Sequence, residues 1–146
     1  MTPALETPPP EAALAELADE FELLGDWEER YRHVIDLGRE LQPLSPEERT
    51  DANKVRGCAS QVWLVTEPHE HRLEFRGDSD AHIVRGLIAI LLRLYSGRSP
   101  EQILNFDAKA ALAELGLSSA LSTQRSNGLN AMLARIKADA ERTGGR

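Results

Sequence analysis

The sequence is poor in cysteine and in aromatic residues. Its 146 residues include one cysteine, two tryptophans, two tyrosines and three phenylalanines. A single cysteine cannot build an internal disulfide framework, and no positively charged start followed by an apolar stretch marks a signal peptide. The longest apolar run, residues 83–95, is interrupted by Arg85 and Arg93 and is too short to cross a bilayer. We therefore expect a protein of the reducing cytoplasm with no membrane span.

Basic residues are also scarce, because 17 lysines and arginines are opposed by 24 acidic residues, for a net charge of −7. Nucleic-acid binding needs clustered Lys and Arg to neutralise phosphates, and the sequence has no such cluster. The glycine-containing stretches lack the Lys-Ser/Thr of a phosphate loop. Nucleic acid is therefore excluded as a partner, and nucleotide binding has no support.

The length is that of one domain, with a core that buries most of its apolar surface. Residues 1–10 contain Pro3 and a proline triplet at 8–10, which cannot form helix and offer little to bury. We expect residues 1–10 to be a disordered tail and residues 11–146 to form a single domain.

Apolar residues recur at helical spacing in several segments. The first helix runs through residues 14–24 and a second follows the cap Asp26. A central helix over residues 81–95 is apolar nearly all round and is predicted to be capped by Asp80. Three further helices are expected: one that begins at Ser99 and Pro100, one over residues 108–115 that Gly116 stops, and one that begins near Arg125 or Ser126.

The remaining pattern predicts short strands. Residues 62–65 read as a strand, residues 73–75 alternate as its hairpin partner, and the polar residues 68–71 form the turn. Residues 54–56 can add a third strand. The predicted fold is α+β, with a small antiparallel sheet of about three strands packed against several helices.

Cys58, the only cysteine, lies directly after Gly57 and before the first strand. Gly57 permits a positive φ angle before the thiol, and Lys54 and Arg56 favour the thiolate, which is the reactive form. This placement suggests sulfur chemistry. Buried cysteine also serves as a small apolar filler, and the residues alone leave both readings open.

The segment from 53 to 65, Asn-Lys-Val-Arg-Gly-Cys-Ala-Ser-Gln-Val-Trp-Leu-Val, resembles the cysteine motif of the SufE family of sulfur-acceptor proteins. The resemblance continues in order over about residues 20–140. Its other blocks are Asp-Trp-Glu-Glu-Arg-Tyr at 26–31, Ile-Asp-Leu-Gly at 35–38, Gly-Asp-Ser-Asp-Ala at 77–81, Ile-Val-Arg-Gly-Leu-Ile-Ala at 83–89, Asn-Phe-Asp at 105–107 and Arg-Ser-Asn-Gly-Leu at 125–129.

This resemblance implies a sulfur relay. Cys58 would accept persulfide sulfur from a pyridoxal-phosphate-dependent cysteine desulfurase (SufS-like), stimulate it, and pass the sulfur to an iron–sulfur scaffold complex (SufBCD-like). The protein would hold no cofactor, would be a co-substrate rather than an enzyme, and is expected to be a monomer or weak homodimer. Two alternatives remain, a regulatory partner of a paralogous desulfurase and a stand-alone thiol-dependent enzyme. Ala59 departs from the family, because many relatives carry glutamine there.

The resemblance also implies roles for other residues. Gly57 and Ser60 belong to the Gly-Cys-x-Ser frame and support the cysteine loop. Asp78 and Asp80 either cap the central helix or hold Cys58 in an inward position, and both readings can be true. Arg125 is either a solvated arginine or a partner contact, and the second is favoured because a helix N-terminus is a poor place for a cation.

The histidines give weaker signals. His69 and His71 alternate as two ligands on one strand would, but they fall in the predicted polar turn, so we expect no metal. A Cys–His pair would need a histidine beside Cys58, for which His82 is the least remote candidate. The commoner role of His82 is that of an exposed residue at a helix start.

Overall fold

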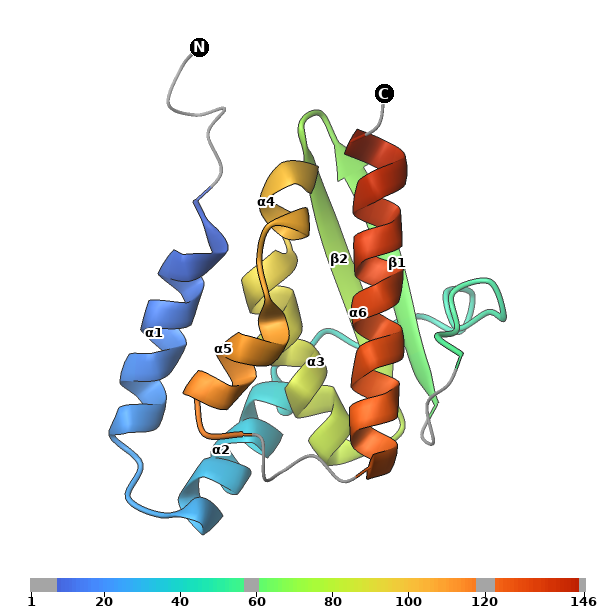
Figure 1. Ribbon diagram of the computed structural model, residues 1–146. Helices are drawn as coiled ribbons and strands as arrows, with labels where there is room; N and C mark the ends of the chain where they lie inside the picture. Colours follow the sequence, from blue (N-terminus) through green and yellow to red (C-terminus); the bar gives the residue numbers. More distant parts are fainter. Residues whose placement is uncertain (1–7, 57–60, 118–122, 145–146) are drawn as a thin grey trace.

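The computed structural model describes residues 8–56, 61–117 and 123–144, with the backbone alone for residues 123–126 and 144. Two helices precede a β-hairpin, and the other helices follow it (Figure 1). The chain therefore has the predicted α+β class. In chain order the elements are α1 (Pro10–Glu22), α2 (Trp27–Arg39), β1 (Val62–His69), β2 (Arg72–Ser79), α3 (His82–Tyr95), α4 (Pro100–Leu104), α5 (Ala108–Glu114) and α6 (Thr123–Gly144).

Several predicted helix ends are confirmed by their caps. The Asp26 carboxylate accepts the Glu29 N–H at 2.9 Å, and Ser99 forms a reciprocal capping box with Gln102 at the start of α4. Gly116 follows α5 with a φ of 76°, which a residue with a side chain rarely adopts. Residues 1–7 of the predicted tail lie outside the described residues. Pro10, which the prediction also places in the tail, is buried and begins α1.

Strands β1 and β2 form an antiparallel hairpin that pairs Val62 with Ser79 and Thr66 with Phe75. The predicted count of about three strands is wrong by one for the described residues, because Lys54 makes only an isolated bridge to Trp63. Residues 46–53 are mostly turns and the connection to β1 follows soon after Lys54, so the segment is too short to form a ladder.

The predicted turn at residues 68–71 is also too long. Strand β1 continues through Pro68 and His69, and only Glu70 and His71 separate the strands, with Glu70 at a φ of 55°. Pro68 lacks an N–H group and is tolerated in a strand at the edge of a sheet.

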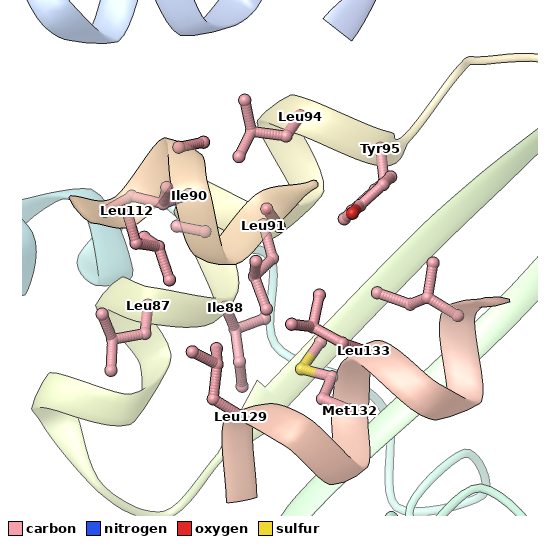
Figure 2. Packing of buried hydrophobic residues seen from close by; sticks show 14 of the residues in the cluster. Leu87, Ile88, Ile90, Leu91, Leu94, Tyr95, Leu112, Leu129, Met132 and Leu133 are labelled. Atoms are coloured by element: carbon pink, nitrogen blue, oxygen red, sulfur yellow. The ribbon is translucent and has the colours of Figure 1, made fainter. Parts of the chain in front are cut away.

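Helix α3 is central, as predicted. Ile88 and Leu91 are 1% and 0% exposed, and they lie beside Leu129, Met132 and Leu133 of α6 (Figure 2). A Cβ atom added at Gly77 of β2 would lie 2.9 Å from Cγ2 of Ile88 and 3.7 Å from Cε of Met132. Since one position of a strand points to one face, α3 and α6 pack on the same face of the hairpin.

Helices α2 and α3 cross at two glycines. A Cβ atom on Gly86 would lie 2.1 Å from the Val34 carbonyl oxygen, and one on Gly38 would lie 2.6 Å from the Gly86 nitrogen. Real Cβ atoms never approach so closely, so the contact needs glycine at both positions.

The open end of the hairpin, at Val62 and Ser79, positions the residues around Cys58. It lies at the same end of the molecule as the first turns of α3 and α6 (Figure 1). Among the described helices, none has the length and apolar character needed to cross a bilayer.

Candidate functional site

Cys58, with Gly57 and Ser60, lies outside the described residues, but the chain on both sides of this segment is described. The N–H group of Val55 donates to the Val62 carbonyl at 2.8 Å, and Leu64 N–H donates to the Asn53 carbonyl at 2.8 Å. These bonds flank the Lys54–Trp63 bridge. The connection that carries Cys58, residues 56–61, is therefore closed by backbone hydrogen bonds at its base.

Asp80 makes a contact that the sequence did not predict. Its Oδ1 accepts the N–H of Gln61 at 3.1 Å, and its own N–H donates to the Gln61 carbonyl at 3.4 Å. The N-cap of α3 is Ala81, which makes no side-chain cap bond, so the prediction that Asp80 caps this helix is wrong. Helix α3 begins at His82, one residue later than predicted, and the Asp80 carboxylate binds the chain that leaves the cysteine segment instead.

Asp78 lies on β2, opposite Trp63, and is 1% exposed. Its carboxylate accepts Arg49 Nη2 at 2.6 Å, the Ser79 N–H at 2.8 Å and the Leu44 N–H at 3.2 Å. Arg85 Nε lies 3.2 Å from Oδ1, the oxygen that also accepts the Ser79 N–H, and Arg85 Nη2 donates to the Leu41 carbonyl. Asp78 thus joins the α2–β1 connection to β2 and α3, and it does not serve as a helix cap.

The charge state of Asp78 follows from these contacts. Burial alone raises the pKa of the Asp78 carboxyl, but the hydrogen bonds from Arg49, Ser79 and Leu44 and the charge of Arg85 outweigh burial. The pKa of Asp78 is therefore lowered from its ordinary value of 3.8, and the group is ionised at neutral pH.

The same network reaches the strand that follows Cys58. The guanidinium carbon of Arg49 lies 5.3 Å from the centre of the Trp63 ring, a cation–π distance. Trp63 is 9% exposed. Arg49 therefore interacts with both Asp78 and Trp63. These two contacts hold the α2–β1 connection against the start of β1.

Arg135 of α6 reaches the segment that precedes Cys58. Its Nη2 donates to the Ala52 carbonyl at 2.9 Å and its Nη1 to the Lys54 carbonyl at 3.5 Å. Nothing in the spacing of Arg135 separates it from the other polar positions of the last helix, so the sequence does not mark it as a site residue.

Arg125 lies in the first turn of α6, which begins at Thr123, two or three residues before the predicted start near Arg125 or Ser126. Its side chain lies outside the described part of the structure. The backbone places Arg125 at the end of the molecule where the hairpin opens (Figure 1).

The histidines form no metal site within the described residues, where no group of three or more metal-ligating side chains occurs. His69 ends β1 with its Nε2 3.8 Å from Glu74, and His71 lies in the turn beside Glu70. Both rings are about half exposed. His82 is the first residue of α3 and is exposed.

A shallow hollow of about 430 Å³ lies on α2, lined by Trp27, Glu28, Tyr31, Arg32 and Ile35. None of the residues that flank the cysteine segment lines it. The hollow is therefore separate from the candidate site.

Comparison with known proteins gives consistent matches along the chain. The family model described as "SufE: Fe-S metabolism associated domain" matches residues 15–140. An uncharacterized SufE-like protein of Rhizobium etli is 52% identical over 134 residues, which cover 89% of this chain and 90% of that protein. An uncharacterized SufE-like protein of Rhizobium meliloti is 48% identical over 133 residues, covering 88% and 95%.

Among solved structures, the solution structure of a hypothetical protein from Thermus thermophilus has a similar fold. The TM-score is 0.76 over 94% of this chain and 98% of that chain, at 20% sequence identity. This likeness concerns the fold alone.

Proposed function

The chain belongs to the SufE family, whose domain is associated with Fe–S metabolism, and from this membership we propose that it is a sulfur acceptor and carrier in iron–sulfur cluster assembly. Cys58 accepts persulfide sulfur from a pyridoxal-phosphate-dependent cysteine desulfurase. It then passes this sulfur to an iron–sulfur scaffold complex in the reducing cytoplasm.

The acceptance step is a thiol exchange without net oxidation or reduction. The Cys58 thiolate attacks the terminal sulfur of the partner's cysteine persulfide, and a new sulfur–sulfur bond forms to Cys58. The bond between the two partner sulfurs breaks, and the partner cysteine leaves as a thiolate. Repeating the exchange with a thiolate of the scaffold complex delivers the sulfur and restores Cys58.

One observation carries the proposal: the only thiol of the chain lies in a short connection whose two flanking segments are held by described contacts. The Val55–Val62 hydrogen bond closes the connection at its base, and Asp80 binds Gln61. A sulfur carrier needs a thiol that a partner can approach and whose position is reproducible, because the reacting sulfurs must meet in line.

The protein acts as a co-substrate and activator. By removing the persulfide from the desulfurase, it frees that enzyme for the next turnover. Lys54 and Arg56 lie within four residues of Cys58 in the sequence, and nearby cations favour a thiolate, while the family motif gives Gly57 and Ser60 a supporting role. Arg125 contacts the desulfurase from the first turn of α6.

The test is a sulfur-loading experiment. The protein is incubated with free cysteine and a cysteine desulfurase of the same organism, and its intact mass is measured before and after a reducing agent is added. We expect a gain of one sulfur atom that the reductant reverses, and no gain for Cys58→Ser. No gain with any desulfurase of the organism overturns the proposal.

The same experiment separates the alternatives. If only a paralogous desulfurase loads Cys58, the protein serves that system. If the desulfurase is stimulated equally by Cys58→Ser, the protein is a regulatory partner without sulfur chemistry. Substrate turnover by the purified protein alone would indicate a thiol-dependent enzyme.

A further inference from the structure

Arg135 connects α6 to a segment far away in the sequence. The two carbonyl groups that its guanidinium binds, those of Ala52 and Lys54, lie 83 and 81 residues earlier in the chain. Arg135 is half-buried, and its two terminal nitrogens each take one carbonyl. The guanidinium fork therefore bridges two carbonyls that are two residues apart.

The same segment is bound from its other side by β1. Asn53 accepts the Leu64 N–H through its carbonyl, and Lys54 bridges to Trp63. Residues 52–54 thus lie between a strand and a helix. The strand contact fixes the distance of the segment from β1, and the Arg135 contact fixes how the segment is turned toward α6.

The position of this segment limits the position of the thiol. Four residues lead from Lys54 to Cys58, and a fully extended chain of that length spans only about 14 Å. The chain after Cys58 is tied at Gln61 by Asp80. Arg135 thus binds the chain before Cys58 in the sequence, and Asp80 binds the chain after it.

The other cationic side chains of α6 that the structure describes bind elsewhere. Lys137 donates to the carbonyls of Ile103 and Phe106 around α4, and Arg142 pairs with Asp139 of its own helix. A lysine at 135 keeps the charge but has one nitrogen, so it cannot place two separate nitrogens on two carbonyls in a fixed geometry. The residue type therefore matches the contact.

We propose that Arg135 is a positioning residue for Cys58: through the carbonyls of Ala52 and Lys54 it sets the orientation in which the chain enters the cysteine segment. The link between Arg135 and sulfur transfer rests on the proposed function. The expected effect of Arg135 on the reactivity of the Cys58 thiol does not depend on that function.

The test measures the reactivity of Cys58, which is unambiguous because the chain has no other thiol. Iodoacetamide alkylation of the full chain is followed by mass spectrometry between about pH 6 and pH 10, which brackets an ordinary thiol pKa. The variants are Arg135→Ala, Arg135→Lys and the control Arg142→Ala, which removes the same side chain from the same helix.

For Arg135→Ala we expect the rate at the high-pH plateau to rise about tenfold, the scale of one lost hydrogen bond to a charged group. Arg135→Lys should show a smaller rise, and Arg142→Ala should match the wild type. Backbone amide signals of Gly57, Cys58 and Ser60 in labelled protein should shift in Arg135→Ala and not in the control. If Arg135→Ala does not fold, Arg135→Lys supports the same comparison.

Sulfur transfer gives the second readout. With a saturating desulfurase, Arg135→Ala should load Cys58 about tenfold more slowly with an unchanged dissociation constant, because positioning affects the transfer step rather than docking. If the wild type is never loaded, the proposed function fails while the alkylation comparison still decides the role of Arg135. Coincident alkylation profiles and amide spectra for Arg135→Ala and wild type overturn the inference, even where loading succeeds.

Discussion

The Asp80 carboxylate accepts the backbone N–H of Gln61 at 3.1 Å, and the Asp80 N–H returns a hydrogen bond to the Gln61 carbonyl at 3.4 Å. Gln61 is the first described residue after Cys58, and Asp80 lies two residues before α3. This reciprocal pair ties the chain that leaves the thiol to the start of the central helix. Of the two roles that the sequence predicts for Asp80, a helix cap and a support for Cys58, the contacts exclude the cap.

Removing the Asp80 acceptor should loosen the segment after Cys58. For Asp80→Ala we expect the unfolding free energy to fall by about 1 kcal/mol, the usual net value of one hydrogen bond, and the alkylation rate of Cys58 to rise. Asp80→Asn keeps an acceptor oxygen without the charge and should remain close to wild type. Urea titration and alkylation kinetics check both effects. Equal behaviour of the two variants would show that the charge, and not the hydrogen bond, is responsible.

Replacing the thiol should abolish stimulation of the desulfurase. Cys58→Ser keeps nearly the same side-chain volume but cannot form a persulfide, so the fold and docking should be retained. We expect the rate of sulfide release to return to that of the desulfurase alone, while the dissociation constant measured by titration stays within about twofold. Stimulation that survives the substitution would contradict the carrier mechanism.

The fold class and much of the element order could be predicted because they depend on local pattern. The segment that is apolar nearly all round forms the central helix α3. Asp26, Ser99 and Gly116 lie at the helix ends that their residue types predict. The family could be recognised because several sequence motifs of the family occur in the same order over most of the chain.

The contacts around the candidate site could not be read from spacing. Arg49, Asp78 and Arg85 meet although they come from a loop, a strand and a helix, and Arg135 binds carbonyls more than 80 residues away. Such pairings are set by the tertiary fold. Local rules assigned Asp80 to the nearest helix, because a cap is the usual partner of an aspartate there, whereas the hairpin brings Gln61 closer.

The proposed partner contact predicts a binding defect for Arg125→Ala. Loss of one arginine from a docking surface should weaken desulfurase binding by about tenfold, while the alkylation rate of free Cys58 stays unchanged. The matched control is Arg142→Ala, in the last turn of the same helix and at its other end. Titration calorimetry measures the affinity. A dissociation constant equal to that of the control would remove Arg125 from the interface.

The crossing of α2 and α3 predicts a strong effect of one methyl group. In Gly86→Ala the new Cβ would lie 2.1 Å from the Val34 carbonyl oxygen, so the helices must move apart. We expect the unfolding free energy to fall by about 3 kcal/mol, as in other overpacked cores. In Gly25→Ala the nearest atom to the new Cβ is 3.6 Å away, and stability should change little. Equal denaturation midpoints for the two variants would contradict the close approach.

The buried Asp78 predicts how stability depends on pH. Because its folded-state pKa is lowered below 3.8, its ionised form stabilises the protein fully above that value, and the contribution is lost as the pH falls through the lower folded-state pKa. Asp78→Asn leaves Arg49 and Arg85 without their buried counter-charge and should cost about 3 kcal/mol at neutral pH. The difference from wild type should shrink as the pH falls below 3.8, since protonation then removes the same charge from the wild type.

Urea unfolding at several pH values measures this difference in unfolding free energy. The control is Asp36→Asn, which breaks the exposed pair with Arg39. A difference that stays constant down to acid pH would show that the Asp78 carboxylate stabilises the fold through its shape and hydrogen bonds, independently of its charge.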